Sequence, residues 1–182
     1  MLELKSEENV LSGYLPVVKG IHVDELSQEV LRMKVVRPDA SAVLLYNTDL
    51  AEFILVEQYR YPISGSTIEI IAGKVDNGET PEQAAVRELK EEVGYEITED
   101  RLNKVVSICP SPGYAQETIH IYAASVTNAD KVSDGGGVAS EHEDVKILTF
   151  NAVELLNNIE SGNIKDAKTI CAITIQALKI SL

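Results

Sequence analysis

Residues 87–92 contain one arginine and three glutamates, a group of side chains that could bind a metal ion or take part in acid–base chemistry. In a helix, Glu88 and Glu92 would lie one turn apart on one face, with Glu91 beside them. Arg87 precedes Glu91 by four residues and can pair with it. Three carboxylates this close repel one another unless a cation lies among them. Because hard oxygen ligands suit Mg²⁺ or Mn²⁺, the cluster indicates a divalent metal site, and a solvated acidic helix face is the alternative.

The residues around the cluster predict the helix that carries it. Thr80 followed by Pro81 and Gln83 is a helix-start signature, and Gly94 is typical of a helix end. The apolar residues of the segment recur at helical spacing and form a buried stripe, which consists of Val86, Leu89 and Val93. The stripe turns the acidic residues away from the core.

Apolar, β-branched runs separated by turn residues predict strands on both sides of this helix. The predicted strands are 41–47, 53–59, 66–72, 104–109, 118–126 and 145–150. Within 118–126, the pattern places Ile119, Ile121 and Ala123 inward and Thr118, His120 and Tyr122 outward. Two helical patterns close the chain, at 151–162 and 166–181. Residues 14–26 and 29–36 look like strands of a small N-terminal sheet, so we expect a β extension over 1–40 and an α/β domain over 41–182.

Composition and charge limit the classes of function. The 182 residues are 45% hydrophobic and 25% charged, which suits one substantial core. A net charge of −13 argues against nucleic acid as a partner, and allows a phosphorylated ligand only if metal ions supply positive charge. The apolar runs are too short to span a bilayer, and the N-terminus lacks a signal-peptide pattern, so we expect a cytoplasmic protein without a membrane partner. Cys109 and Cys171 are expected to be buried thiols.

The spacing of residues 73–94 matches a known motif. Gly73 is followed after five residues by Glu79, and after a further seven by Arg-Glu-Leu-x-Glu-Glu-x-Gly. This pattern resembles the Nudix box, and a chance match in a chain of this length is on the order of one in a million. Tyr95 is a departure, because the position after Gly94 is usually aliphatic. The resemblance implies an α/β/α sandwich with a mixed β-sheet, and a metal-dependent hydrolase of nucleoside diphosphates linked to another moiety.

The flanking segments resemble one branch of that family. Residues 57–62, 69–79, 110–124 and 135–148 are similar to hydrolases of ADP-ribose, GDP-mannose and related nucleoside diphosphate sugars. The resemblance implies Mg²⁺, for which Mn²⁺ could substitute, and no organic cofactor. It assigns the metal to Glu88, Glu92 and the carbonyl of Ala72, with Glu91 nearby as a catalytic residue. It assigns substrate contacts to Arg60, Glu57, Pro112, Gly113 and Glu117.

Four of these five substrate contacts have a plain structural alternative. Arg60 would hold the diphosphate through its planar, permanently charged guanidinium, or it is a surface arginine that ends a strand. Glu117 would contact the sugar or the nucleoside, or it is an edge-strand glutamate. Pro112 and Gly113 would shape the pocket wall, or they form an ordinary turn.

The general base is expected on a different segment, the glycine-rich stretch before residue 145. Glu141 and Glu143 lie two residues apart and would face the same side of an extended segment. We expect Glu141 to be the base and Glu143 to be an added metal ligand, and the reverse assignment remains open. His142 is the alternative base because imidazole titrates near neutral pH. Gly135–Gly137 would let this segment close.

Other functions are compatible with the same box. A hydrolase of dinucleoside polyphosphates or NADH, an isomerase, and a sensor without hydrolysis are the alternatives within the fold. An RNA-decapping hydrolase is disfavoured by the net charge and by the lack of a basic, aromatic-interleaved stretch. Relatives in the branch pair through their N-terminal strands, so the resemblance also implies a homodimer.

Overall fold

In the computed structural model of the protein, residues 2–138 and 145–181 are described. They belong to two compact units. The main unit comprises residues 40–108 and 119–182, and the N-terminal unit comprises residues 1–39 and 109–118. Each unit has its own β-sheet.

The main unit is built around a mixed sheet of seven strands. Five strands follow the order β11-β5-β4-β10-β8, while β6 pairs with β5 and β7 pairs with β4. Strands β4 and β10 run parallel, and the remaining neighbours run antiparallel. The strands are β4 (Ala40–Asn47), β5 (Glu52–Arg60), β6 (Gly65–Glu69), β7 (Ile71–Lys74), β8 (Asn103–Ile108), β10 (Ile119–Val126) and β11 (Val145–Phe150).

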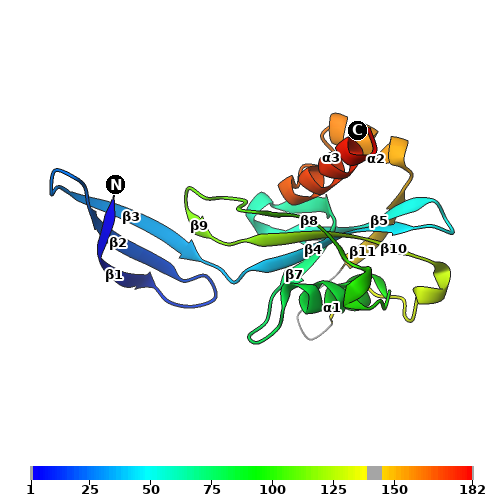
Figure 1. The fold of residues 1–182 in the computed structure, drawn as a ribbon, viewed down its shortest axis with the longest axis horizontal. Coiled ribbons are helices and arrows are strands. Elements are labelled where there is room, and N and C mark those ends of the chain that lie inside the picture. The colour runs from blue at the N-terminus through cyan, green and yellow to red at the C-terminus, as the bar shows by residue number, and fades with distance from the viewer. Residues whose placement is uncertain (1, 139–144, 182) are drawn as a thin grey trace. The chain divides into compact units, whose positions relative to one another are not determined.

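Helices cover both faces of this sheet, α1 on one side and α2 with α3 on the other (Figure 1). One buried cluster lies on the α1 side and includes Leu89, Val93 and Tyr122. The other includes Leu155 of α2 and Ile173 of α3. The helices are α1 (Pro81–Val93), α2 (Ala152–Glu160) and α3 (Ala167–Ser181), with short 3₁₀ helices η1 (Tyr61–Ile63), η2 (Glu99–Arg101) and η3 (Asn128–Asp130). These layers confirm the predicted α/β/α sandwich with a mixed sheet.

The N-terminal unit is a sheet of four strands in the order β1-β2-β3-β9. Its strands are β1 (Glu3–Leu11), β2 (Val17–Val23), β3 (Glu29–Val36) and β9 (Ala115–Gln116). The first three form an antiparallel meander, and β9 adds parallel to β3. Every residue of β1 is exposed, and this strand was not predicted because its sequence is polar and carries no clear alternation.

Two predictions about the strands are wrong. The run 66–72 forms two strands rather than one, because β6 pairs with β5 whereas β7 pairs with β4. Tyr122 does not point outward, since it is only 2% exposed and lies in the core beneath α1. A central strand with helices on both faces buries both of its sides, so the expected inward and outward alternation does not hold there.

The two cysteines are less buried than the sequence predicts. Both cysteines are free, but Cys109 is exposed and Cys171 is half-buried, so the prediction of buried thiols is wrong.

Of the helices in the described part of the chain, none has the length and apolar character needed to cross a lipid bilayer.

Candidate active site

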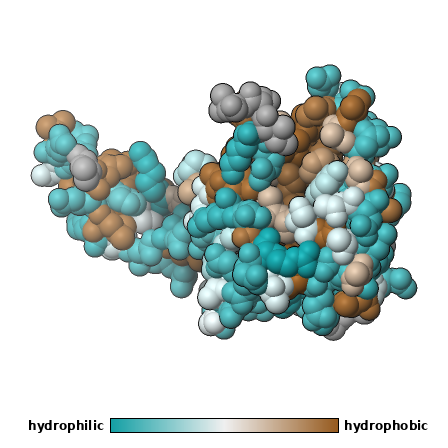
Figure 2. Space-filling view, turned by 45° about the vertical axis from the view of Figure 1, so that its right-hand side comes forward, coloured by the Kyte–Doolittle hydropathy of each residue, from teal (hydrophilic) through white to brown (hydrophobic). Residues whose placement is uncertain are grey.

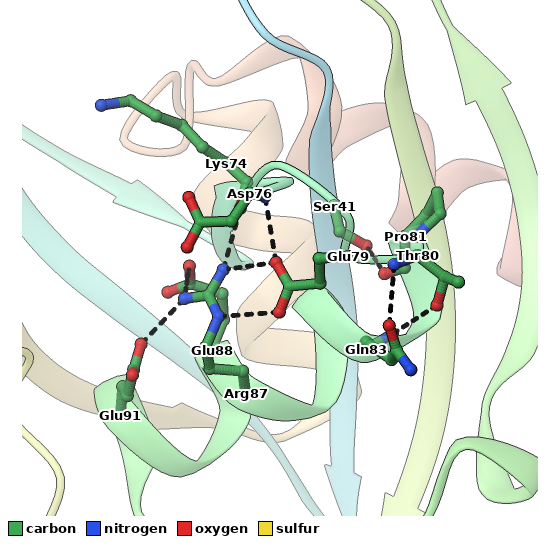
Figure 3. Close-up of polar contacts among 10 residues, drawn as sticks. All are labelled: Ser41, Lys74, Asp76, Glu79, Thr80, Pro81, Gln83, Arg87, Glu88 and Glu91. Carbon is green, nitrogen blue, oxygen red and sulfur yellow. Dashed lines mark hydrogen bonds and ion pairs between the residues drawn. The ribbon is translucent and has the colours of Figure 1, made fainter.

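Helix α1 begins and ends where the sequence predicts. Thr80 Oγ1 accepts a hydrogen bond from Gln83 N at 3.1 Å, and Gln83 Oε1 accepts one from Thr80 N at 2.9 Å (Figure 3). Ser41 Oγ of β4 donates to the carbonyl of Pro81 at 2.7 Å. Gly94 ends the helix with a φ of 76°, a left-handed conformation that suits glycine. These contacts fix the face that α1 turns toward the sheet.

Arg87 is the centre of the polar contacts on α1 (Figure 3). Its Nε and Nη2 donate to the two carboxylate oxygens of Glu79 at 2.9 and 3.1 Å. Its Nη1 donates to Glu88 Oε1 at 2.6 Å and to Glu91 Oε2 at 2.9 Å, which confirms the predicted pairing with Glu91. Its Nη2 also donates to the carbonyl of Lys74 at 2.9 Å. One guanidinium therefore joins α1 to the end of β7 and to the loop that follows.

These contacts also set the charge states of the cluster. The hydrogen bonds to Glu79, together with the charge and hydrogen bond of Glu88, raise the pKa of Arg87 above its ordinary range. In return, the hydrogen bond from Arg87 lowers the pKa of the Glu79 carboxyl. The backbone N–H of Asp76, which donates to Glu79 Oε2 at 3.0 Å, lowers it further. Arg87 and Glu79 are therefore both charged at neutral pH.

Two carboxylates of α1 are buried against the backbone of β7. Glu88 is 7% exposed and Glu92 is 2% exposed. The N–H of Ala72 donates to Glu92 Oε2 at 3.3 Å. A Cβ atom at Gly73 would lie 1.7 Å from Glu88 Oε1, so the carboxylate lies against the strand only because residue 73 is glycine. The glycine of the motif thus makes room for a carboxylate of the same motif.

The donor atoms gathered here fit a hard divalent cation. Glu88 and Glu92 bring carboxylate oxygens to the Ala72–Gly73 segment of β7, and such oxygens suit Mg²⁺ or Mn²⁺. Within the described residues, no three Asp, Glu, His or Cys side chains are grouped closely enough to hold an ion as they stand. Arg87 donates to Oε1 of Glu88, and because a carboxylate has two oxygens with several acceptor sites, the guanidinium and a cation can share it.

Arg60, the predicted diphosphate ligand, lies at the end of β5 with its side chain 41% exposed. Its Nε and Nη2 donate to the two carboxylate oxygens of Glu69 at 2.8 and 2.9 Å. These hydrogen bonds raise the pKa of Arg60, and the negative charge of Glu92 acts in the same direction. Arg60 is therefore within electrostatic reach of Glu92, one of the two buried carboxylates of α1.

Sequence reasoning missed the partner of Arg60. Glu69 is 3% exposed and contacts both Arg60 and Lys168 of α3. The signal that could have found it is a single charged residue inside the apolar run 66–72. A buried carboxylate needs a cationic partner, but the run alone does not say which cation that is.

Glu57, another predicted substrate residue, pairs with a lysine of the neighbouring strand. Its Oε2 lies 3.3 Å from Nζ of Lys146 on β11, and its side chain is 34% exposed. Glu57 and Lys146 are direct partners in the antiparallel register of β5 and β11. An exposed cross-strand ion pair of this kind contributes little to stability.

The other predicted substrate residues lie in the N-terminal unit. Pro112 and Gly113 belong to a turn in which Tyr114 N donates to the carbonyl of Ser111 at 3.1 Å. Glu117 Oε1 lies 3.3 Å from Nε of Arg37, and the Glu117 side chain is 12% exposed. Their substrate roles stay predictions.

The predicted general base and its neighbours lie outside the described residues. This holds for Glu141, His142 and Glu143. Their roles therefore remain predictions from the sequence.

The fold and the site together define a family. The sandwich carries on α1 an Arg-Glu-x-x-Glu-Glu sequence whose first glutamate lies against a glycine of the sheet. Residues 36–171 match the family model of the NUDIX domain. The chain belongs to the Nudix family.

Relatives that cover nearly the whole chain carry different names. The chain is 32% identical over 175 residues to a methanol dehydrogenase activator of Bacillus methanolicus, covering 96% of this chain and 92% of the relative. It is 32% identical over 177 residues to an ADP-ribose pyrophosphatase of Bacillus subtilis (strain 168), covering 97% and 93%. It is 33% identical over 175 residues to a GDP-mannose pyrophosphatase of Citrobacter koseri, covering 90% and 89%.

A solved structure has the same fold. The crystal structure of an ADP compounds hydrolase aligns with a TM-score of 0.80 over 99% of this chain and 94% of that chain. The sequence identity is 19%, so this similarity supports the fold and not a function.

Proposed function

We propose that this protein hydrolyses the diphosphate linkage of nucleoside diphosphate sugars and releases a nucleoside monophosphate and a sugar phosphate. The observation that carries the proposal is the burial of Glu88 and Glu92 against β7, with Arg87 holding Glu88 and Glu91 on the same helix. Two relatives are named for ADP-ribose and GDP-mannose, which supports this substrate class.

Magnesium is the proposed metal, held by Glu88, Glu92, the carbonyl of Ala72 and Glu143. When bound, it would neutralise charge on the diphosphate and activate the attacking water. The net charge of −13 supports this role, because an acidic protein repels a bare diphosphate. Manganese offers the same preference for oxygen ligands and is expected to substitute.

The chain's own residues position the reactants. Arg60 would bind the diphosphate through its planar fork of N–H donors. Arg87 holds Glu91, the second proposed catalytic residue, at 2.9 Å, and so fixes the acidic face of α1. Glu57, Pro112, Gly113 and Glu117 are the further proposed substrate contacts.

Glu141 is the proposed general base, which would accept the proton of the attacking water. Support comes from the sequence alone, where Glu141 and Glu143 are spaced to share one face. Glu141→Gln is expected to lower kcat by about 100-fold or more, whereas His142→Ala should stay within about threefold of wild type. The opposite ranking would make His142 the base.

The test of the substrate class is a hydrolysis panel in the presence of Mg²⁺, with the products identified by chromatography. The panel contains ADP-ribose, GDP-mannose, ADP-glucose, UDP-glucose, NADH, a diadenosine polyphosphate, deoxynucleoside triphosphates and a capped RNA. AMP with ribose 5-phosphate, or GMP with mannose 1-phosphate, supports the proposal. Turnover confined to polyphosphates, triphosphates or capped RNA overturns the substrate class, and tight binding without turnover of any compound would indicate a sensor.

A second candidate function follows from one relative. The methanol dehydrogenase activator is as similar to this chain as the ADP-ribose pyrophosphatase is, at 32% identity each. Identity alone therefore does not choose between the two names. Stimulation of a purified methanol dehydrogenase by this protein, set beside the panel, would show whether it has the activator's role.

We further propose a homodimer, with residues 1–40 as the dimerisation element. Apolar side chains of the N-terminal unit lie at the surface, as Figure 2 shows in brown at the left. Among them Leu4, Leu11, Leu31 and Met33 are each about half exposed, from 49% to 57%. An exposed apolar sheet of this kind favours association with a second copy. Light scattering should give twice the 19.9 kDa chain mass, and Leu31→Glu should shift it toward the monomer.

We also place the protein in the cytoplasm. Both cysteines are free and Cys109 is exposed, which suits a reducing compartment. Cell fractionation tests this, and recovery of the protein outside the cytoplasmic fraction would contradict it.

A further inference from the structure

The amino group of Lys168 is buried between two carboxylates at the start of α3, outside the acidic cluster of α1. Lys168 is 9% exposed. Its Nζ lies 3.1 Å from Asp166 Oδ1 and makes a short hydrogen bond to Glu69 Oε2. Buried lysines are uncommon and need partners of opposite charge. Lys168 therefore has a defined place in the fold, set by Glu69 and Asp166.

Glu69 is shared between two cations from different parts of the chain. Arg60 of β5 binds both of its oxygens, and Lys168 binds Oε2. Burial alone would raise the pKa of Glu69, but the hydrogen bond of Arg60 and the charge of Lys168 outweigh burial and lower it. The carboxylate is therefore ionised at neutral pH. Because Asp166 also pairs with Lys168, the cluster holds two cations and two carboxylates, and Glu69 is the group that joins Arg60 to Lys168.

The start of α3 is attached firmly to the sheet. Asp166 Oδ2 accepts hydrogen bonds from Thr169 N at 2.9 Å and from Thr169 Oγ1 at 2.6 Å. Thr169 Oγ1 in turn accepts a hydrogen bond from the N–H of Ile70, between β6 and β7, at 2.8 Å. Thr169 is fully buried. Lys168 thus lies between Asp166 and Thr169, whose side chains tie the start of α3 to the sheet, and it can fix the position of Glu69.

The contact with Glu69 leaves one edge of the Arg60 guanidinium available. The contact between Arg60 and Glu69 uses Nε and Nη2 of Arg60, so the Nη1 amino group of Arg60 is directed away from Glu69. The Arg60 side chain is 41% exposed while the Glu69 side chain is 4% exposed. A buried carboxylate therefore orients a guanidinium that belongs to a half-exposed side chain. A bidentate contact to phosphate depends on such an orientation.

We propose that Glu69 and Lys168 are positioning residues that hold the Arg60 guanidinium toward the diphosphate. Lys168 fixes the Glu69 carboxylate, so that Arg60 keeps its orientation toward the phosphate oxygens. This inference rests on the proposed function and adds to it the two residues that orient its phosphate-binding arginine. Neither residue touches the substrate, and both act through Arg60.

The test compares KM and kcat for ADP-ribose with Mg²⁺ in the wild type and in Lys168→Met. KM is expected to rise about tenfold while kcat stays within about threefold, because ground-state binding of the diphosphate is weakened. Lys90→Met is the matched control, since Lys90 pairs with Glu96 at 2.7 Å on the exposed surface of α1. Its KM is expected to equal that of the wild type.

A double-mutant cycle separates positioning from a general loss of structure. In an Arg60→Met background, Lys168→Met should cause no further rise in KM, because its effect passes through Arg60. A folded Lys168→Met protein with wild-type KM, or additive effects in the cycle, overturns the inference. If Lys168→Met does not fold, the double variant Glu69→Gln/Lys168→Met is measured instead, because it removes both charges together. A KM equal to that of the wild type in this double variant would also overturn the inference. Absence of turnover by the wild type is a separate outcome, which overturns the proposed function and this inference with it.

Discussion

The Glu88 carboxylate occupies the space that a side chain at position 73 would need. A Cβ atom built on Gly73 would lie 1.7 Å from Glu88 Oε1 and 2.0 Å from Cδ. Real Cβ atoms do not come this close to a non-bonded heavy atom, so Gly73 and Glu88 depend on each other. The glycine is required by close approach, since its φ does not fall in the left-handed region.

Gly73→Ala is therefore expected to push the Glu88 carboxylate off β7. We expect the free energy of unfolding to fall by about 1–3 kcal/mol from overpacking. We expect kcat/KM to fall by about 100-fold, because a proposed metal ligand is misplaced. Denaturant unfolding and steady-state kinetics measure the two effects. Gly65→Ala is the control, since the nearest atom to its Cβ would be the carbonyl oxygen of Ile63 at 3.8 Å.

Glu88→Gln tests the proposed metal ligand without changing its shape. Gln can still accept a hydrogen bond from Arg87 Nη1, but it loses the charge that a divalent cation needs. We expect kcat to fall by on the order of 1,000-fold with an unchanged melting temperature. Glu96→Gln, at the exposed pair with Lys90, should keep full activity. A fully active Glu88→Gln enzyme would rule out Glu88 as a ligand.

Arg87→Met is expected to reduce both stability and activity. It removes the guanidinium that binds Glu79, Glu88 and Glu91 and leaves their carboxylates to repel one another. The expected loss of stability is about 1–3 kcal/mol, at the level of hydrogen bonds to charged groups. We expect kcat to fall by about tenfold or more.

Arg101→Met serves as the comparison for Arg87→Met. Arg101 binds both oxygens of Asp130 at 2.6 and 3.1 Å, so its loss also removes a paired ion contact. Stability should fall while kcat is retained. Equal kcat values for the two variants would mean that Arg87 has a structural role only.

The start, the end and the acidic face of α1 were predictable because their signals are local. Thr80 and Gln83 lie three residues apart, and Arg87 and Glu91 lie four apart, so the helix period alone brings each pair together. The contact of Arg87 with the carbonyl of Lys74 depends on how α1 is placed on the sheet. No sequence spacing specifies it.

Contacts between distant segments could not be predicted from one sequence. Glu69 and Lys168 are 99 residues apart, and nothing near either residue points to the other. The break at Ile70 between β6 and β7 has the same origin, because it arises from pairing with two different strands. Local patterns thus predicted the acidic face of α1, but not the burial of Glu88 and Glu92, and the environment of Arg60 required the fold.

The ion pairs of Glu69 with Arg60 and Lys168 also predict how stability depends on pH. Its pKa is lowered in the folded protein, so the folded state favours the ionised form and gains stability above the ordinary value of 4.5. That stability is lost as the pH falls from 4.5 through the lowered value. Glu69→Gln should cost about 3–5 kcal/mol at pH 7, since it leaves cations without their buried partner. The difference from wild type should shrink steadily below pH 4.5.

Denaturant unfolding of the wild type and Glu69→Gln between pH 7 and pH 3 measures this difference. Glu8→Gln is the comparison, because the pKa of Glu8 is also lowered, by its hydrogen bond to Lys19, but the Glu8 side chain is exposed. Solvent weakens such a surface pair, so Glu8→Gln should follow the wild-type curve at every pH. A Glu69→Gln penalty that stays constant down to pH 3 would mean that shape, rather than charge, makes Glu69 stabilising.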